Sequence, residues 1–243
     1  MNALTELLKQ TLQRRFPDAL PLGRGLASSV GTGLPDLDAM LPGRGLSRGR
    51  LTAWRPGGGA TAVLRATCES ALARGERVAW VDVAGVQSGE FWRAGPLLVR
   101  PASEREALAG AEELLRCGGF ALVVLSGGGR AAAREAVRLS RAARAGGAAF
   151  VMVSTDPAIA HLRVTSRIPA DGYRWRRDPF GEPVDVVAVR IEVQAMALGW
   201  GGRAAFELPV RTHHGRIAPE PRLVDRRGAP PSARWPRRCQ TSV

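Results

Sequence analysis

A glycine-rich turn between a strand-like run and a helical run is the feature that most constrains the fold of this chain. The turn reads Pro56-Gly57-Gly58-Gly59-Ala60-Thr61, follows the apolar run Leu51 to Trp54, and precedes an alanine-rich helical pattern. A turn in this setting is typical of a phosphate-binding loop, whose backbone N–H groups face the phosphates. It therefore predicts an α/β protein.

The turn lacks the side chain that such a loop needs for its chemistry. A working loop uses a Lys to reach the terminal phosphates and a Ser or Thr hydroxyl to hold Mg²⁺. Ala60 occupies the Lys place, and Lys9 is the only lysine in the chain. We therefore expect a degenerate loop and no bound cofactor. The interpretation we favour for the glycines is a tight turn that suits the packing of a strand against a helix.

Strand-like and helical runs alternate after this point. Strands are expected at Leu51 to Trp54, Val78 to Asp82, Leu97 to Arg100, Ala121 to Leu125 and Ala149 to Ser154, with helices near 62–74, 104–116 and 131–145. Such alternation predicts a mainly parallel central sheet with helices on both faces. After about residue 170, strand-like runs at Tyr173 to Arg177, Val184 to Val193 and Arg203 to Val210 are separated only by Pro/Gly turns, which predicts an antiparallel meander at one side.

Three segments are expected along the chain: an N-terminal helix and connector (1–30), the core (31–217) and a Pro/Arg-rich tail (218–243) that should be disordered. Apolar residues at helical spacing mark the N-terminal helix: Leu4, Leu7, Leu8 and Leu12. This helix either packs on its own domain or forms an arm that docks on another subunit.

The charge of the chain suggests an acidic partner. The formal net charge is +13, which favours nucleic acid, although an arginine excess also arises from GC-rich coding sequence. A candidate polyanion patch consists of Arg134, Arg138, Arg141 and Arg144 on one face of the predicted helix, together with Arg174, Arg176 and Arg177 around Trp175. A solvated helix face is the alternative for the first four arginines.

The cysteines, the histidines and the lengths of the apolar runs limit which sites the chain can form. The cysteines Cys68, Cys117 and Cys239 are widely spaced, which predicts neither a disulfide framework nor a zinc site. The adjacent His213 and His214 would point to opposite sides of an extended segment, so we expect no metal site there. No signal peptide and no apolar run near 18 residues is found, so a cytoplasmic protein without membrane contact is expected.

The order of predicted elements resembles the core of RecA recombinase over roughly residues 31–212. The stretches GTGLPDLDAMLPGRGLSRGRLT and LLVRPASEREALAGAEELLRCGGFALVVLSG carry the likeness. RecA-type ATPases use the loop Lys, an Asp after the apolar strand, and a Glu two residues past an Asp on the second strand. Here these places hold Ala60, Ser126 and Ala84, the last following Asp82. The three losses predict a pseudo-ATPase. The two long DNA-binding segments of RecA are also reduced, after Ser126 and after Ser154.

Small RecA-like proteins with an N-terminal helix, a degraded phosphate loop and no long DNA loops resemble the ImuA family, many of whose members are labelled "SulA-like". The resemblance implies a non-catalytic accessory factor of DNA-damage-induced (SOS) translesion synthesis and mutagenesis. It implies binding to RecA and to ImuB, an inactive Y-family polymerase homologue, with an error-prone polymerase as an indirect partner. It also implies a position at the nucleoid when DNA is damaged.

Within that resemblance, partner contacts are expected in the N-terminal helix and in the tail. The tail residues concerned are Arg234, Trp235, Arg237 and Arg238. Two alternatives stay open: a DNA-dependent ATPase that uses Arg55 or Arg65 with Asp82, and a DNA-binding protein that relies on charge alone, with weak non-specific binding. The "SulA-like" label would suggest a cell-division inhibitor, which no residue supports.

Overall fold

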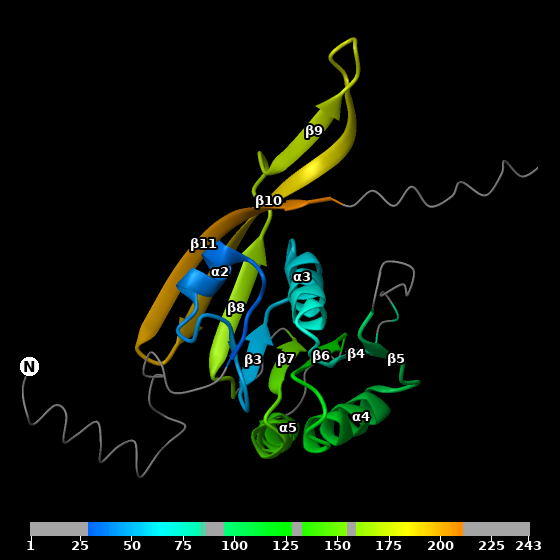
Figure 1. Ribbon diagram of the computed structural model, residues 1–243, viewed down its shortest axis with the longest axis vertical. Helices are drawn as coiled ribbons and strands as arrows, with labels where there is room; N and C mark the ends of the chain where they lie inside the picture. The colour runs from blue at the N-terminus through cyan, green and yellow to red at the C-terminus, as the bar shows by residue number, and fades with distance from the viewer. Residues whose placement is uncertain (1–28, 84, 86–94, 128–132, 155–158, 211–243) are drawn as a thin grey trace, which may run out of the picture. The chain divides into compact units, whose positions relative to one another are not determined.

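The described residues form a mixed α/β fold around a mostly parallel sheet, as the sequence predicts. The computed structural model describes residues 29–83, 85, 95–127, 133–154 and 159–210. Six strands run parallel in the order β8 (Leu162–Arg167), β3 (Leu51–Trp54), β7 (Ala149–Val153), β6 (Leu122–Ser126), β4 (Val78–Asp82) and β5 (Leu97–Val99) (Figure 1). The fold-class prediction is confirmed for the mostly parallel sheet.

Antiparallel strands extend this sheet beyond β8. Strand β10 (Pro183–Ala197) pairs antiparallel with β8 and with β11 (Trp200–Pro209), while β9 (Tyr173–Arg177) pairs with the first part of β10. The predicted antiparallel addition is therefore present. Strand β8 itself was not predicted. Its buried Leu162 and Val164 alternate with exposed Arg163 and Thr165, a period of two that is short and easily read as a connection.

Helices cover both faces of the parallel strands. On one face lie α3 (Ala60–Ala73) and the short α2 (Pro35–Met40), and on the other lie α4 (Glu104–Arg116) and α5 (Ala133–Gly146). In β6, Leu122 and Val124 face the α3 side, whereas Val123 and Leu125 face α4 and α5. Because successive strand side chains point to opposite faces, a strand buried on both sides becomes a continuous apolar run.

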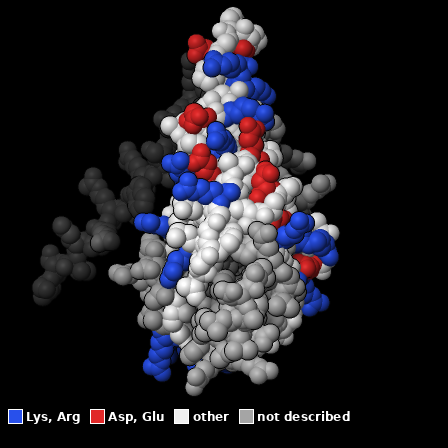
Figure 2. All heavy atoms as spheres, turned by 90° about the vertical axis from the view of Figure 1, so that its left-hand side faces the viewer, with Lys and Arg blue, Asp and Glu red and all other residues white. Residues whose placement is uncertain are grey.

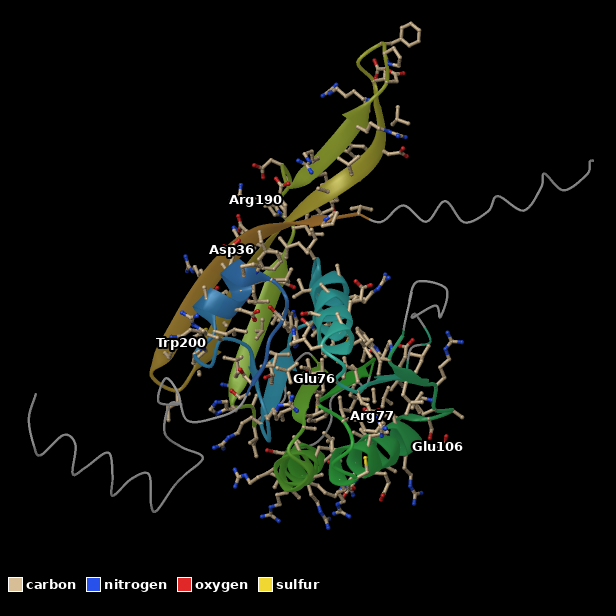
Figure 3. The ribbon with its side chains drawn as sticks, viewed as in Figure 1. Asp36, Glu76, Arg77, Glu106, Arg190 and Trp200 are labelled. Carbon is tan, nitrogen blue, oxygen red and sulfur yellow. The ribbon has the colours of Figure 1, made fainter. Side chains whose placement is uncertain are left out.

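The start of α4 shows why its boundary could be predicted. Ser103 accepts a hydrogen bond from the Glu106 backbone N–H (3.2 Å), and the Glu106 carboxylate accepts one from the Ala102 N–H (3.0 Å). This reciprocal arrangement satisfies two N–H groups that the helix cannot pair itself. Glu106 is labelled in Figure 3 at this end of α4.

Helix α2 belongs to the segment that leads into β3, and the sequence reading missed it. The segment also contains the antiparallel pair β1 (Ser29–Val30) and β2 (Leu46–Ser47). A Cβ atom added at Gly202 of β11 would lie 2.6 Å from the Met40 sulfur, so α2 packs closely on β11. This contact, between residues far apart in sequence, covers the β11 end of the sheet near Trp200 (Figure 3).

The predicted N-terminal helix and basic tail, including Leu4, Leu7, Leu8, Leu12, Arg234, Trp235, Arg237 and Arg238, lie outside the described residues. Their boundaries stay predictions. Within the described ranges, no helix is long and apolar enough to cross a membrane.

Candidate functional site

The glycine-rich turn joins β3 to α3, where the sequence places it. Gly59 adopts a left-handed conformation (φ 84°) at the helix N-cap, and its carbonyl accepts the first helical hydrogen bond from Val63 N–H (3.0 Å). The Ala60 N–H donates to the Gly57 carbonyl (3.2 Å), which closes the turn on itself. A left-handed residue at this point favours glycine.

The three glycines are packed against the protein's own chain. A Cβ atom added at Gly57 would lie 2.7 Å from the Ser166 carbonyl oxygen, and one added at Gly58 would lie 2.9 Å from the Ile168 backbone nitrogen. At Gly59 the nearest atom would be the Ile191 Cδ1, at 2.7 Å. The end of β8 and the middle of β10 therefore approach too closely for any side chain. This packing gives a structural reason for the glycines that does not involve phosphate.

The residue at the Lys place is part of the core. Ala60 is only 3% exposed and belongs to the core on the α3 side, whereas the following Thr61 and the preceding Pro56 are exposed. A long charged side chain at position 60 would have to leave this apolar environment or displace its neighbours, because burying an unpaired ammonium is costly. The loop is thus adapted to a small apolar side chain at this place.

A buried polar network lies at the carboxyl ends of the neighbouring strands. Asp82 pairs in register with Ser126, Ser126 with Val153, and Val153 with Trp54. These four residues therefore form one row across the adjacent strands β4, β6, β7 and β3. The Trp80 Nε1–H donates to the Ser126 Oγ (2.8 Å), and the Ser126 hydroxyl donates to the Asp82 Oδ1 (3.2 Å). Asp82, at 1% exposure, is the only carboxylate in this row of four residues. Ala84, the predicted place of a lost Glu, lies outside the described residues.

The network gives Ser126 a structural role. Its hydroxyl both accepts from a buried indole and donates to a buried carboxylate, so it contributes a hydrogen bond to each of two buried polar groups. A carboxylate at position 126 could accept from Trp80 but could not donate to Asp82 in its ionised form. Serine at the end of β6 therefore fits this structure better than aspartate does.

The seven arginines of the predicted polyanion patch are not brought together. Arg134, Arg138, Arg141 and Arg144 are exposed on α5, whereas Arg174, Arg176 and Arg177 lie on β9, at the opposite end of the view in Figure 1. The structure thus divides the predicted patch into two separate groups.

The β9 group is compensated locally. Arg176 forms an ion pair with Asp185, Arg174 lies 3.5 Å from the Glu207 carboxylate, and Arg177 donates to the Gly181 carbonyl (2.5 Å). Figure 2 shows basic and acidic side chains interspersed over the part of the molecule where β9, β10 and β11 lie. This surface is mixed rather than basic.

Exposed apolar side chains gather on the same β9–β10 ribbon: Tyr173, Trp175, Phe180 and Val184. Phe180, at the turn, is 90% exposed. Trp175 stands opposite Val186, and Tyr173 stands opposite Val189, so the two aromatic rings lie on one side of β9. The sequence analysis named Trp175 but not the others, although Tyr and Trp at alternate positions could have revealed them.

The α5 group has neighbours that sequence spacing could not reveal. Glu112 of α4 bridges Arg116 (2.6 Å) and Arg138 (2.8 Å), which ties α4 to α5. On the other flank of α5, a hollow of about 410 Å³ is lined by residues that include Arg50, Arg141, Arg144 and His161. Burial lowers the pKa of His161 below its ordinary value, and the positive charge of Arg50 lowers it further.

The residues named for the alternative ATPase lie on or beside different elements. Arg55 lines a groove of about 880 Å³ with residues of β8, β10 and β11, whereas Asp82 lies on β4, with β7 and β6 between β3 and β4. Arg65 lies on α3. Among the described residues, no group of three or more His, Cys, Asp or Glu could hold a metal ion, and the described cysteines Cys68 and Cys117 are free. His213, His214 and Cys239 lie outside that part of the chain.

The fold and this site define a mixed α/β protein with a glycine-rich strand-to-helix turn. A scan against protein-family models finds no match to this sequence, and a search of the curated proteins finds none either.

Proposed function

We propose that this protein is a non-catalytic, RecA-like accessory factor of DNA-damage-induced translesion synthesis. It acts in the cytoplasm, at the nucleoid when DNA is damaged, by binding RecA and ImuB and modulating RecA filaments, with the error-prone polymerase as an indirect partner. The partners and the process come from the resemblance of the sequence to the ImuA family. The absence of catalysis is argued from the site.

The observation that carries the proposal is the packing of Gly57, Gly58 and Gly59 against the end of β8 and against Ile191. Phosphate loops need backbone N–H groups that are open to a ligand. Here the close approach of the chain's own backbone accounts for the glycines. The buried Ala60 and the Trp80–Ser126–Asp82 network support the same conclusion, since they replace charge stabilisation with packing and hydrogen bonds.

The proposed mechanism is occupation of one filament interface without ATP. Head-to-tail filaments grow only when each subunit offers two competent faces. A RecA-like subunit that docks through its N-terminal arm but binds no nucleotide would cap or destabilise a filament. The exposed aromatic side chains of the β9–β10 ribbon, Tyr173, Trp175 and Phe180, suit a second protein contact, because Tyr and Trp dominate binding at interfaces.

The lack of nucleotide binding is tested with a fluorescent ATP analogue and Mg²⁺. We expect no saturable binding by the wild-type protein, and none by Ala60→Lys, because position 60 is buried. Ala60→Lys should also lower the free energy of unfolding, by about 2 kcal/mol or more. Saturable binding that unlabelled ATP displaces from the wild-type protein would refute the expected lack of nucleotide binding.

The docking role of the N-terminal segment is tested by deleting residues 1–25 and measuring RecA binding by surface plasmon resonance. The deletion should abolish RecA binding while the unfolding midpoint stays close to that of the full chain. A matched deletion of residues 219–243 separates the tail from the arm. Full-strength RecA binding without residues 1–25 would show that docking uses another surface.

A further inference from the structure

An arginine-rich surface runs along the exposed side of α5 and continues onto its neighbours. Figure 3 shows nitrogen-tipped side chains projecting from α5 on the side away from the sheet. Hollows flank the helix on both sides: one of about 630 Å³ includes Arg116, Arg134, Arg138 and Arg141 in its lining, and the other, described above, includes Arg50 and Arg144. We call these six arginines the α5 surface.

Two arginines of this surface have no acidic partner in the described part of the protein. Glu112 is shared by Arg116 and Arg138, and Glu135 also lines the first hollow. Arg134 and Arg141 form no ion pair with any other residue in the described ranges, and both are exposed. The second hollow is lined by Arg50, Arg141 and Arg144 and by no Asp or Glu among the described residues. This contrasts with β9, where Arg174 and Arg176 each have an acidic partner.

The spacing of the arginines suits a row of charges. From Arg134 to Arg144 the helix rises about 15 Å, with arginines on successive turns along one side. Arginine on both flanks of a helix can contact phosphates on either side of it. Sequence-independent binding to nucleic acid is made of such contacts between arginine and phosphate.

The composition of the surface favours nucleic acid over an acidic protein. Protein interfaces depend on a buried centre of aromatic and apolar side chains. Around α5 the only large exposed apolar side chain in the hollow linings is Ile159, whereas the aromatic residues are exposed on β9 and its turn. The chain therefore separates an arginine-rich surface from an aromatic one.

From these observations we infer that the α5 surface binds the phosphate backbone of nucleic acid directly and without sequence preference. Arg134 and Arg141 can contact phosphates without breaking an ion pair to any described residue. This inference does not depend on RecA or on the proposed function, and it gives the protein a DNA contact of its own.

The test is the salt dependence of binding to a short fluorescein-labelled DNA duplex, measured by anisotropy with the full chain and no RecA. The variant Arg134→Gln/Arg141→Gln should weaken binding and reduce the magnitude of the slope of log K against log salt by about 2. The matched control Arg55→Gln/Arg203→Gln removes two exposed arginines from the groove between β8, β10 and β11 and should leave the slope unchanged. Glu135→Gln should strengthen binding, because it removes a carboxylate from the first hollow.

A single-stranded probe of the same sequence identifies which form of the backbone is preferred; a slope change of about 1.4 is expected there. An unchanged slope in Arg134→Gln/Arg141→Gln with both probes would overturn the inference, as would an equal loss in the control. Polyglutamate that binds through Arg134 and Arg141 more tightly than either DNA would show that an acidic protein is the ligand instead. The unfolding midpoint of each variant, measured in parallel, should match that of the wild type.

Discussion

At the scale of single residues, the site is shaped by what its side chains satisfy inside the protein. Ser126 accepts from the Trp80 indole and donates to Asp82, so its hydroxyl has a complete structural role. Ala60 fills the core at the start of α3. Both residues stand where the resemblance to RecA predicts a charge, and burial and hydrogen bonding account for both.

Ser126→Ala should lower the free energy of unfolding by about 1–3 kcal/mol, because Trp80 Nε1 and Asp82 each lose a buried hydrogen bond. Urea unfolding followed by tryptophan fluorescence measures the change. Ser140→Ala on α5 serves as the control and should change stability by less than about 0.5 kcal/mol, since Ser140 is half-buried and has no hydrogen bond within the described residues. Equal effects of the two substitutions would show that the network contributes nothing.

His161 predicts a pH dependence. Its pKa in the folded protein lies below the ordinary value because of burial and Arg50. The unfolded chain therefore takes up this proton first, so its contribution to stability is constant above pH about 6.5 and is lost as the pH falls further. Relative to His161→Gln, the wild type should lose stability as the pH falls below about 6.5. Arg50→Gln should raise the His161 pKa and shrink that loss, which NMR titration checks; an unchanged pKa would contradict the role given to Arg50.

At the scale of elements, the glycines of the β3–α3 turn allow the end of β8 and the Ile191 side chain to pack closely against the turn. Gly58→Ala would place a Cβ atom 2.9 Å from the Ile168 backbone nitrogen, so we expect destabilisation of about 1–3 kcal/mol. Gly110→Ala in the interior of α4 is the matched control. The Cβ atom that this substitution adds meets nothing within 4 Å. The substitution should therefore stabilise the protein by about 0.5–1 kcal/mol, because alanine is the better helix former. A neutral Gly58→Ala would show that Ile168 does not restrict the residue at position 58.

The elements of the parallel sheet could be predicted from the sequence, and the reason is physical. Apolar runs such as Leu122 to Leu125 are buried on both faces, and the helix of residues 104–116 begins at a capping pair, Ser103 with Glu106. Strand β8 and helix α2 were missed because their burial depends on β3 and β11, which lie far away in sequence.

The candidate site could be predicted only in part. The sequence shows Ala60 at the expected place of the loop Lys, because that place is fixed by the glycine turn. It shows Ser126 at the expected place of an Asp, because that place follows an apolar strand. The contacts that fill the turn could not be predicted, since Ser166, Ile168 and Ile191 lie far later in the chain. The predicted seven-arginine patch divides into two groups for the same reason: periodicity places residues on one helix face but says nothing about how α5 and β9 are arranged.

At the scale of the whole molecule, the described core has two surfaces of different chemistry. The exposed aromatic residues of the β9–β10 ribbon suit a protein, and the α5 surface suits phosphates. In the β3–α3 turn, Cβ atoms added at Gly57, Gly58 and Gly59 would meet the end of β8 and the Ile191 side chain. This arrangement fits a protein that brings partners together at damaged DNA and leaves catalysis to them.

The most direct test of the central claim is a titration of this protein into RecA filaments formed on single-stranded DNA, with ATP hydrolysis followed throughout. The protein alone on the same DNA is the control. We predict that RecA hydrolysis falls as the protein is added, and that the control hydrolyses no ATP. Hydrolysis by the protein alone, or RecA hydrolysis that stays constant at saturating protein, would contradict a filament-directed pseudo-ATPase.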